Sequence, residues 1–311
     1  MRRFIMDCDT GGDDASAIVL AVASNDIELL GVTACMGNLP LYQTYRNARE
    51  LIKYLGVPGV PVLKGSERPL TREYWVATEK EHYLRVEGIT RDVIDAVDMD
   101  AVEWMAKTLR ESEEKITLIP LAPLTNIAKL MFAYPDLVKE KVDEIIIMGG
   151  GMYFGNTSGA AELNIYADPE AAQAVFSFGT PVVMCGLDVC YRGYITPEEN
   201  QQIREIGNKV ANVFSSVVQR SLDTEDPTRS LMYDSIPVVY ALYPEIFTTV
   251  TASVEVECGS ELCDGMTVCE TVKPEGRRCW SNAPKIHKVV LDVDREAYVE
   301  AVKRILRESE Y

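Results

Sequence analysis

Four carboxylates lie within eight residues near the start of the chain, in the segment MDCDTGGDDA that covers residues 6–15. Asp7 and Asp9 follow an apolar run and are two residues apart, so on a β-strand their side chains point to the same face. Asp13 and Asp14 begin an apolar, helix-like segment, where the helix dipole favours negative charge. The glycines between the two pairs allow the tight turn that would bring all four side chains together.

This acidic cluster indicates a binding site for a cation. Carboxylates so close together repel each other strongly unless a cation lies among them. Hard divalent cations such as Ca²⁺ take about six to eight oxygen ligands, which carboxylates can supply. A helix N-terminus alone would explain Asp13 and Asp14, but it would not explain Asp7 and Asp9 at the end of a buried strand. The pattern therefore predicts a metal or catalytic site.

The elements that must position this cluster alternate between strands and helices. Nearly continuous apolar runs, typical of parallel strands buried on both faces, occur at 3–7, 28–35, 116–121, 144–149 and 181–186. Helical patterns are found at 13–24, 40–55, 98–112, 124–133, 169–178, 209–222 and 294–308, and late strands are expected at 253–269 and 286–292. The alternation predicts an α/β fold with a Rossmann-like open, mostly parallel sheet flanked by helices. Ligands of such sheets bind at the carboxyl ends of the strands, where the acidic cluster is expected.

The chain reads as a single domain over residues 1–311, because it contains no repeat, low-complexity tract or linker. Hydrophobic residues make up 47% and charged residues 25%, a normal balance for a globular protein. Residues 64–95 are the least regular part, and we expect them to form a lid or to be partly helical.

The charge balance excludes some partners. Lys plus Arg is 31 and Asp plus Glu is 48, so the net charge of −17 repels phosphate backbones and anionic lipids. We therefore expect a small neutral substrate or a cation as the partner, and no nucleic acid or membrane. The sequence has no secretory signal and no apolar run of about 18 residues, so a cytoplasmic location is expected.

The eight cysteines are interpreted as reduced thiols. Cys258, Cys263, Cys269 and Cys279 cluster near the C-terminus, but they lack the close pairs of a structural zinc site. A zinc or disulfide role for them is the less favoured alternative.

Several ordered segments resemble one known family. MDCDTGGDDA resembles the N-terminal signature of the inosine-uridine-preferring nucleoside hydrolases. Further matches are GVTACMGN at 31–38, LAPLTNIA at 121–128, the whole stretch 148–172, GLDV at 186–189, and Asp234 at a helix start. The resemblance implies the nucleoside hydrolase fold, a homodimer or homotetramer, and a role in nucleoside salvage. The implied reaction is hydrolysis of the N-glycosidic bond of ribonucleosides to ribose and free base by a Ca²⁺-activated water.

The resemblance also implies a role for each matching residue. Asp9, Asp14 and Asp234 would bind Ca²⁺ through their carboxylates, and Leu121 through its backbone carbonyl. Apart from the resemblance, a carboxylate near a metal-bound water can take its proton, and we expect Asp9 to be that base and Asp7 to support the site. The ribonucleoside would be bound by Asp13, Asn38, Met148, Asn156, Glu162 and Asn164.

The residues that would assist the leaving base depart from the family pattern. Many members carry a histidine just before the last metal aspartate, and this chain has Tyr233 there. Tyrosine is a weaker acid at neutral pH, so Tyr233 would hydrogen-bond or stack against the base. His82, in the expected lid, and Arg229 are the other candidates. The preferred nucleobase stays open.

Two other functions fit parts of the sequence. A ribonucleoside-binding regulatory protein would keep the acidic cluster but lack leaving-group activation, as the missing histidine suggests. A metal-dependent phosphotransferase would also begin with a strand and an Asp-x-Asp pair. Such enzymes place Thr or Val two residues after the second Asp, where this chain has Gly11, so this alternative is weaker.

Overall fold

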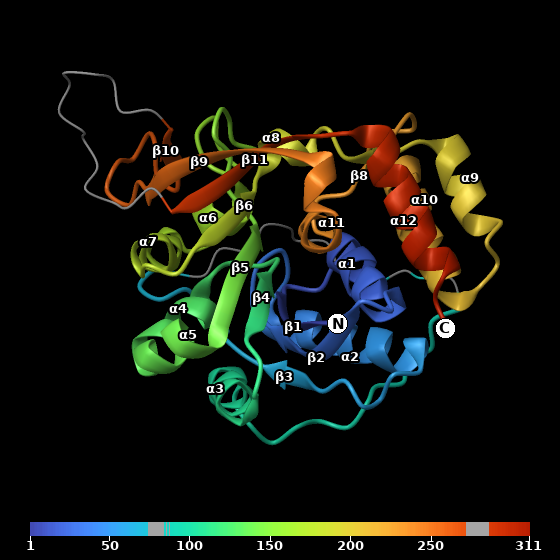
Figure 1. The fold of residues 1–311 in the computed structure, drawn as a ribbon, viewed down its shortest axis with the longest axis horizontal. Helices are drawn as coiled ribbons and strands as arrows, with labels where there is room; N and C mark the ends of the chain where they lie inside the picture. The colour runs from blue at the N-terminus through green and yellow to red at the C-terminus, as the bar shows by residue number, and fades with distance from the viewer. Residues whose placement is uncertain (74–83, 85, 87, 272–285) are drawn as a thin grey trace.

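A nine-stranded sheet runs through the centre of the molecule and carries helices on both faces (Figure 1). The computed structural model describes residues 1–73, 84, 86, 88–271 and 286–311. The strands are β1 (Arg2–Cys8), β2 (Ile27–Ala34), β3 (Val62–Lys64), β4 (Ile116–Pro120), β5 (Val142–Met148), β6 (Val182–Cys185), β9 (Phe247–Val256), β10 (Thr267–Glu270) and β11 (His287–Val293). Their order across the sheet is β10-β9-β11-β6-β5-β4-β1-β2-β3.

The predicted mostly parallel α/β sheet is confirmed. Strands β1 to β6 and β11 form the parallel part of the sheet, while β9 is antiparallel to β11 and β10 is antiparallel to β9. The order β3-β2-β1-β4-β5-β6 is that of a Rossmann-type sheet. From β1 the chain adds β2 and β3 on one side of the sheet, and then β4, β5 and β6 on the other side. This reversal of strand order between β1 and β4 creates the crevice where such sheets bind their ligands.

Two apolar cores, one on each face of the sheet, hold the helices in place. One core involves α1 (Gly12–Ala23), α2 (Leu41–Leu55), α8 (Leu187–Cys190), α9 (Pro197–Arg204), α10 (Lys209–Thr224), α11 (Ser235–Leu242) and α12 (Arg295–Arg307). The other involves α3 (Ala101–Glu111), α4 (Thr125–Ala133), α5 (Pro135–Lys141) and α7 (Pro169–Ser177). On β1, Phe4 and Met6 face the first core and Ile5 faces the second. Burial on both faces explains the nearly continuous apolar strands.

A few segments differ from the sequence-based expectation. The predicted strand at 253–269 is a hairpin of β9 and β10, turned where Gly265 adopts a positive φ of 76° that favours glycine. The sequence analysis also did not predict β3, α5, α8 or α9. It further missed a short helix, α6 (Leu163–Ala167), a 3₁₀ turn (Pro244–Ile246) and a two-stranded sheet of β7 (Tyr194–Ile195) and β8 (Ser230–Leu231). In the expected lid at 64–95, the described residues after Lys64 form no helix or strand, and the remainder lies outside the described residues.

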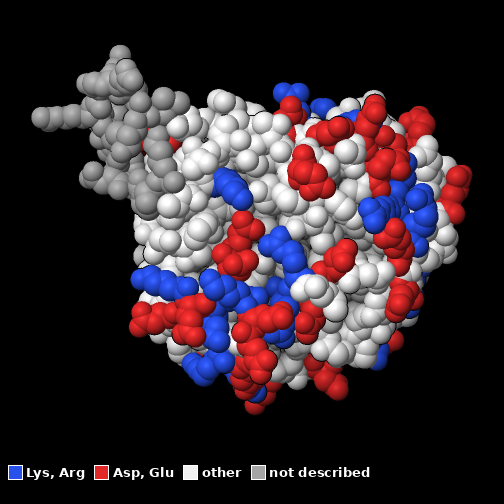
Figure 2. Space-filling model, viewed as in Figure 1, with Lys and Arg blue, Asp and Glu red and all other residues white. Residues whose placement is uncertain are grey.

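The distribution of surface charge and the length of the helices are relevant to the expected partners. On the face seen in Figure 2, basic side chains lie next to acidic ones over much of the surface. None of the helices in the described part of the chain has the length and apolar character that a membrane span needs.

Candidate active site

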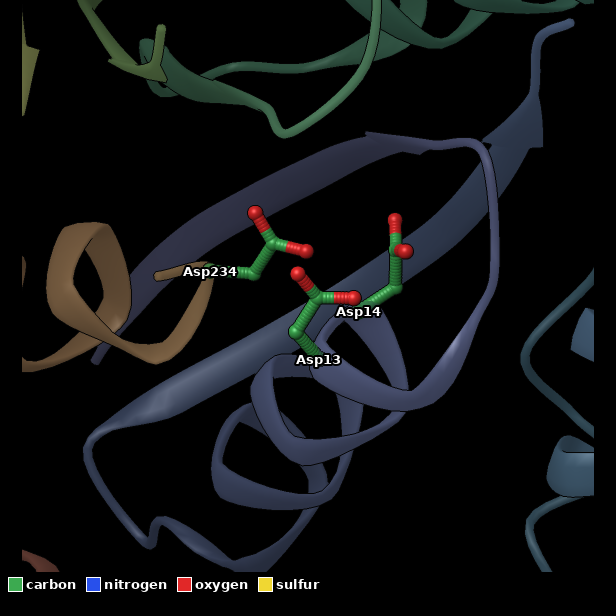
Figure 3. A group of neighbouring side chains, drawn as sticks. All are labelled: Asp13, Asp14 and Asp234. Carbon is green, nitrogen blue, oxygen red and sulfur yellow. The ribbon is translucent and has the colours of Figure 1, made fainter. Parts of the chain in front are cut away.

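Carboxylates from distant parts of the chain meet at the crevice beside β1. Asp13 and Asp14 lie in the first turn of α1, and Asp234 directly precedes α11. One carboxylate oxygen from each of these three residues lies within 4.8 Å of the others. Figure 3 shows the three side chains converging from the two helix starts. The structure therefore brings the last aspartate next to the N-terminal acidic cluster.

The turn after β1 holds Asp9 and Asp14 in fixed orientations. The Gly11 backbone N–H donates to Asp14 Oδ2 at 2.9 Å, and the Asn38 backbone N–H donates to Asp9 Oδ2 at 2.5 Å. Gly37 packs directly on Asp9, because a β-carbon at residue 37 would overlap the Asp9 carboxylate. The loop after β2 therefore closes on Asp9 only because residue 37 is glycine.

The remaining oxygens of these carboxylates are buried and unpaired. Asp9 Oδ1 and Asp14 Oδ1 have no hydrogen-bond partner among the described residues. None of the ion pairs found among the described residues involves Asp9, Asp14 or Asp234. Unpaired buried carboxylates cost several kcal/mol, on the order of what a bound cation would offset. These oxygens are therefore suited to hold a hard cation.

The pKa values of these carboxyl groups are also consistent with a cation-binding site. Burial raises the pKa of Asp9 to about 8. Burial and then the charges of Asp9 and Asp13 raise the pKa of Asp14 well above its ordinary value. Burial, followed by the charges of Asp13 and Asp14, does the same for the pKa of Asp234. Each carboxyl thus resists ionisation in the metal-free chain, and a cation would reverse that preference.

Asp7 is held by partners that the sequence analysis missed. Its Oδ1 accepts hydrogen bonds from Thr33 Oγ1 at 2.5 Å and from Asn126 Nδ2 at 2.8 Å. Asn126 also accepts from the Ser66 N–H at 2.9 Å, so it ties three segments together. Burial raises the pKa of Asp7 to about 7. A polar pair at the start of a helix, Thr-Asn in LAPLTNIA, was the only sequence signal for Asn126.

Asn164 links the ends of two neighbouring strands. Its Nδ2 donates to the Leu121 carbonyl oxygen at 3.0 Å and to the Met148 carbonyl oxygen at 3.1 Å. Glu162 caps the same short helix, α6, and accepts from the Asn164 N–H at 2.9 Å and the Gly150 N–H at 2.9 Å. Burial raises the pKa of Glu162 to about 7. The ends of β4 and β5 and the start of α6 thus form one rigid group.

Two other residues predicted to contact the substrate, Asn156 and Arg229, lie in more open positions. Asn156 is exposed, and its Oδ1 accepts from the Leu163 N–H at 3.0 Å. Arg229 donates to Asp226 Oδ2 at 3.3 Å and lies 5.7 Å from the centre of the Tyr194 ring. Neither partner of Arg229 belongs to the carboxylate group. His82 lies outside the described residues.

Tyr233 lies partly buried next to Asp234. Burial is the largest cause that raises its pKa, followed by the charges of Tyr191, Cys190 and Asp13 and a hydrogen bond with Tyr191. The Tyr233 hydroxyl therefore stays neutral at physiological pH.

The cysteines offer no second metal centre in the described part of the chain. Cys258, Cys263 and Cys269 are free thiols, and Cys279 lies outside the described residues. The group of His, Cys, Asp or Glu found there that could hold a metal is formed by Asp13, Asp14 and Asp234.

The fold and this site define a doubly wound α/β protein with a buried acidic centre at its switch point. Residues 4–300 match the sequence model of the family described as inosine-uridine preferring nucleoside hydrolase, and the chain belongs to this family. It is a ribonucleoside hydrolase, an N-glycosidase, which confirms the predicted family and enzyme class.

Relatives and solved structures match nearly the whole chain. The chain is 37% identical over 309 residues to the pyrimidine-specific ribonucleoside hydrolase RihA of Klebsiella pneumoniae subsp. pneumoniae, covering 97% of both chains. The structure of the plant nucleoside hydrolase PpNRh1 superposes with a TM-score of 0.88 at 27% identity, covering 98% of this chain and 99% of that one. The purine-preferring ribonucleoside hydrolase from Gardnerella vaginalis gives a TM-score of 0.85 at 27% identity with the same coverage.

Proposed function

We propose that this protein hydrolyses pyrimidine ribonucleosides to ribose and free base at a Ca²⁺ site formed around Asp9, Asp14 and Asp234. The observation that carries the proposal is the group of buried carboxylates with unpaired oxygens at the switch point. The preference for pyrimidines is supported by the 37% identity to an enzyme named pyrimidine-specific, against 27% to one named purine-preferring.

The proposed ligands of the ion are the carboxylates of Asp9, Asp14 and Asp234 and the backbone carbonyl of Leu121. This all-oxygen set suits Ca²⁺ better than a soft transition metal. When bound, the ion supplies Lewis-acid activation of water and neutralises the buried carboxylates.

Asp9 is the proposed general base. Its Oδ2 is fixed by the Asn38 N–H and by contact with Gly37, and its Oδ1 is unpaired and available to take a proton. Rupture of the N-glycosidic bond sends the bonding electron pair to the base and leaves positive, oxocarbenium-like charge on the ribose. The nearby Asp13 carboxylate would stabilise that charge.

Ribose recognition is assigned to Asp13, Asn38, Met148, Asn156, Glu162 and Asn164. The hydrogen bonds that fix Glu162 and Asn164 support this role, because polar groups held in place bind a sugar without a large ordering cost. Tyr233, His82 and Arg229 remain the candidates for contact with the leaving base. We further propose a homodimer or homotetramer, which light scattering would test.

A panel of uridine, cytidine, inosine, adenosine and nicotinamide riboside, assayed for free ribose, tests the proposal. We expect the pyrimidine ribosides to be the best substrates, EDTA to abolish release, and added Ca²⁺ to restore it. Better turnover of inosine than of uridine would contradict the pyrimidine assignment. Full activity in EDTA would contradict the metal site.

A further inference from the structure

A hairpin near the C-terminus lies against the glycine-rich loop that carries Asn156. The hairpin is formed by β9 and β10, turns at residues 261–265 and lies close to α6 and α7 (Figure 1). The loop covers residues 149–161 between β5 and α6, and it contains five glycines. Glycine loses more conformational freedom on folding than any other residue, so such a loop needs contacts from outside to keep one conformation.

Thr267, the first residue of β10, binds both backbone groups of Gly151. Its Oγ1 accepts a hydrogen bond from the Gly151 N–H at 3.0 Å and donates one to the Gly151 carbonyl oxygen at 2.7 Å. A hydroxyl group has one proton to donate and can also accept, so this single group satisfies the whole glycine. Thr267 is 1% exposed and Gly151 is buried, so water does not compete for these bonds. The beginning of the loop is thereby fixed to the hairpin.

The two residues that precede β10 hold the far end of the same loop. Met266 forms an antiparallel bridge with Ala161, whose carbonyl oxygen accepts from the Asn156 N–H at 3.1 Å. Gly265 packs on α6, since a β-carbon on this residue would lie 2.9 Å from Tyr166 Cα. Three consecutive residues of the hairpin therefore follow the base of the loop from one end to the other.

The hairpin is itself attached to the body of the molecule. Arg72 Nη2 donates to Asp264 Oδ1 at 2.9 Å and to Glu170 Oε1 on α7 at 2.8 Å. The Gln173 side chain, also on α7, accepts from the Val256 N–H at 2.5 Å. The hairpin is thus held both at its turn and at the end of β9, and it can serve the loop as a rigid support.

We propose that Thr267 is a positioning residue for ribose binding: its two bonds to Gly151 hold the loop in the conformation in which Asn156 contacts the ribose. Thr267 needs no contact with the substrate, because its effect reaches the sugar through the loop. Polar groups that are already in place bind a ligand without the cost of ordering a loop. This inference rests on the proposed function, in which Asn156 binds the ribose.

Steady-state kinetics with uridine test this role in Thr267→Val, which keeps the shape of the side chain and removes its hydroxyl. Gly151 would lose both partners, and the loop would have to move to regain them. We expect KM to rise about tenfold, as loss of one hydrogen bond to the sugar implies, with kcat within about twofold of the wild type. Thr267→Ser retains the hydroxyl and should bring KM back to within about twofold of the wild-type value. KM does not depend on the fraction of folded protein, so partial misfolding cannot imitate this result.

A double-mutant cycle measures whether Thr267 acts through Asn156. Asn156→Ala alone should raise KM about tenfold. Adding Thr267→Val should raise it by less than about twofold more, because the loop then has no ribose contact left to misplace, whereas independent effects would multiply to about 100-fold. Thr251→Val is the matched control, since Thr251 is exposed on β9 of the same hairpin, and its KM and kcat should equal those of the wild type.

Three results would each overturn the positioning role. They are an unchanged KM in Thr267→Val or in Asn156→Ala, a loss confined to kcat, and effects that multiply in the double variant. Release of ribose from no riboside by the wild type would instead overturn the proposed function, and the substrate panel detects that failure before any variant is made.

Discussion

Gly37 lies so close to Asp9 that a β-carbon on residue 37 would overlap the Asp9 carboxylate. The Gly37→Ala variant should therefore displace the proposed base. A misplacement of about 1 Å can lower the rate on the order of 100-fold, so we expect a loss of that size in kcat/KM for uridine. Circular dichroism should report an intact fold.

Gly59→Ala is the control for the Gly37 substitution. A β-carbon at residue 59 would meet nothing within 4 Å, so this variant should keep full activity. Equal activity of the two variants would show that the contact between Gly37 and Asp9 does not position the carboxylate.

Metal removal should lower thermal stability as well as activity. A ligand present at about 100 times its dissociation constant stabilises the folded state by about 2.7 kcal/mol, or about 4 °C in Tm for a chain of this size. We expect Ca²⁺ to raise the Tm of the chelated wild type by that amount. Asp14→Asn removes one proposed ligand and should abolish the shift.

Asp143→Asn serves as the control for metal binding, because Asp143 is exposed at the start of β5. It should respond to Ca²⁺ as the wild type does, as measured by differential scanning calorimetry. A full Ca²⁺ shift in Asp14→Asn would contradict the proposed ligand set.

The sheet and the N-terminal carboxylates could be predicted because their signals are local. Burial on both faces gives β1, β4, β5 and β6 apolar runs, and Asp13 and Asp14 stand in the acidic first turn of a helix as expected. The segment 253–269 was predicted as one strand, although a turn that contains Gly265 divides it into β9 and β10.

The supporting contacts of the site could not be predicted from local patterns. The partners of Asp7, Thr33 and Asn126, come from β2 and α4, and only the packed sheet brings them together. The contact between Tyr191 and Tyr233 depends on β7 and β8, which are too short to give a periodic signal. Asp234 was found only through resemblance, since no spacing connects it with residues 7–14.

The pH dependence of stability should contain a contribution from His287. This buried residue accepts from the Val182 N–H at Nδ1, at 3.2 Å, and its Nε2 lies 3.0 Å from the Phe176 carbonyl oxygen, so the ring is held neutral. Burial lowers its pKa below the ordinary value. The unfolded chain therefore binds the proton first, and stability is lost as pH falls through about 6.5 towards the folded value, by at most about 1.4 kcal/mol per pH unit.

His287→Gln removes this titration. Urea unfolding of both proteins at pH 7.5, 6.5 and 5.5 should give a steeper loss of stability in the wild type than in the variant. Carboxylates that titrate in the same range affect both proteins, so they cancel in the difference. Identical slopes would mean that His287 does not titrate differently in the folded and unfolded chains.

Asn126 should be the most costly of the supporting residues to lose. Its side chain donates to Asp7 and to the Ala34 carbonyl and accepts from the Ser66 N–H, all in a buried setting. Leaving these partners unpaired costs on the order of 1 to 3 kcal/mol each, so Asn126→Ala should lower the free energy of unfolding by about 3 kcal/mol. Asn25→Ala, which removes an exposed bond to the Glu308 carbonyl, should cost less than about 0.5 kcal/mol. Urea titrations followed by circular dichroism measure both values, and equal costs for the two variants would mean that the network around Asp7 adds nothing to stability.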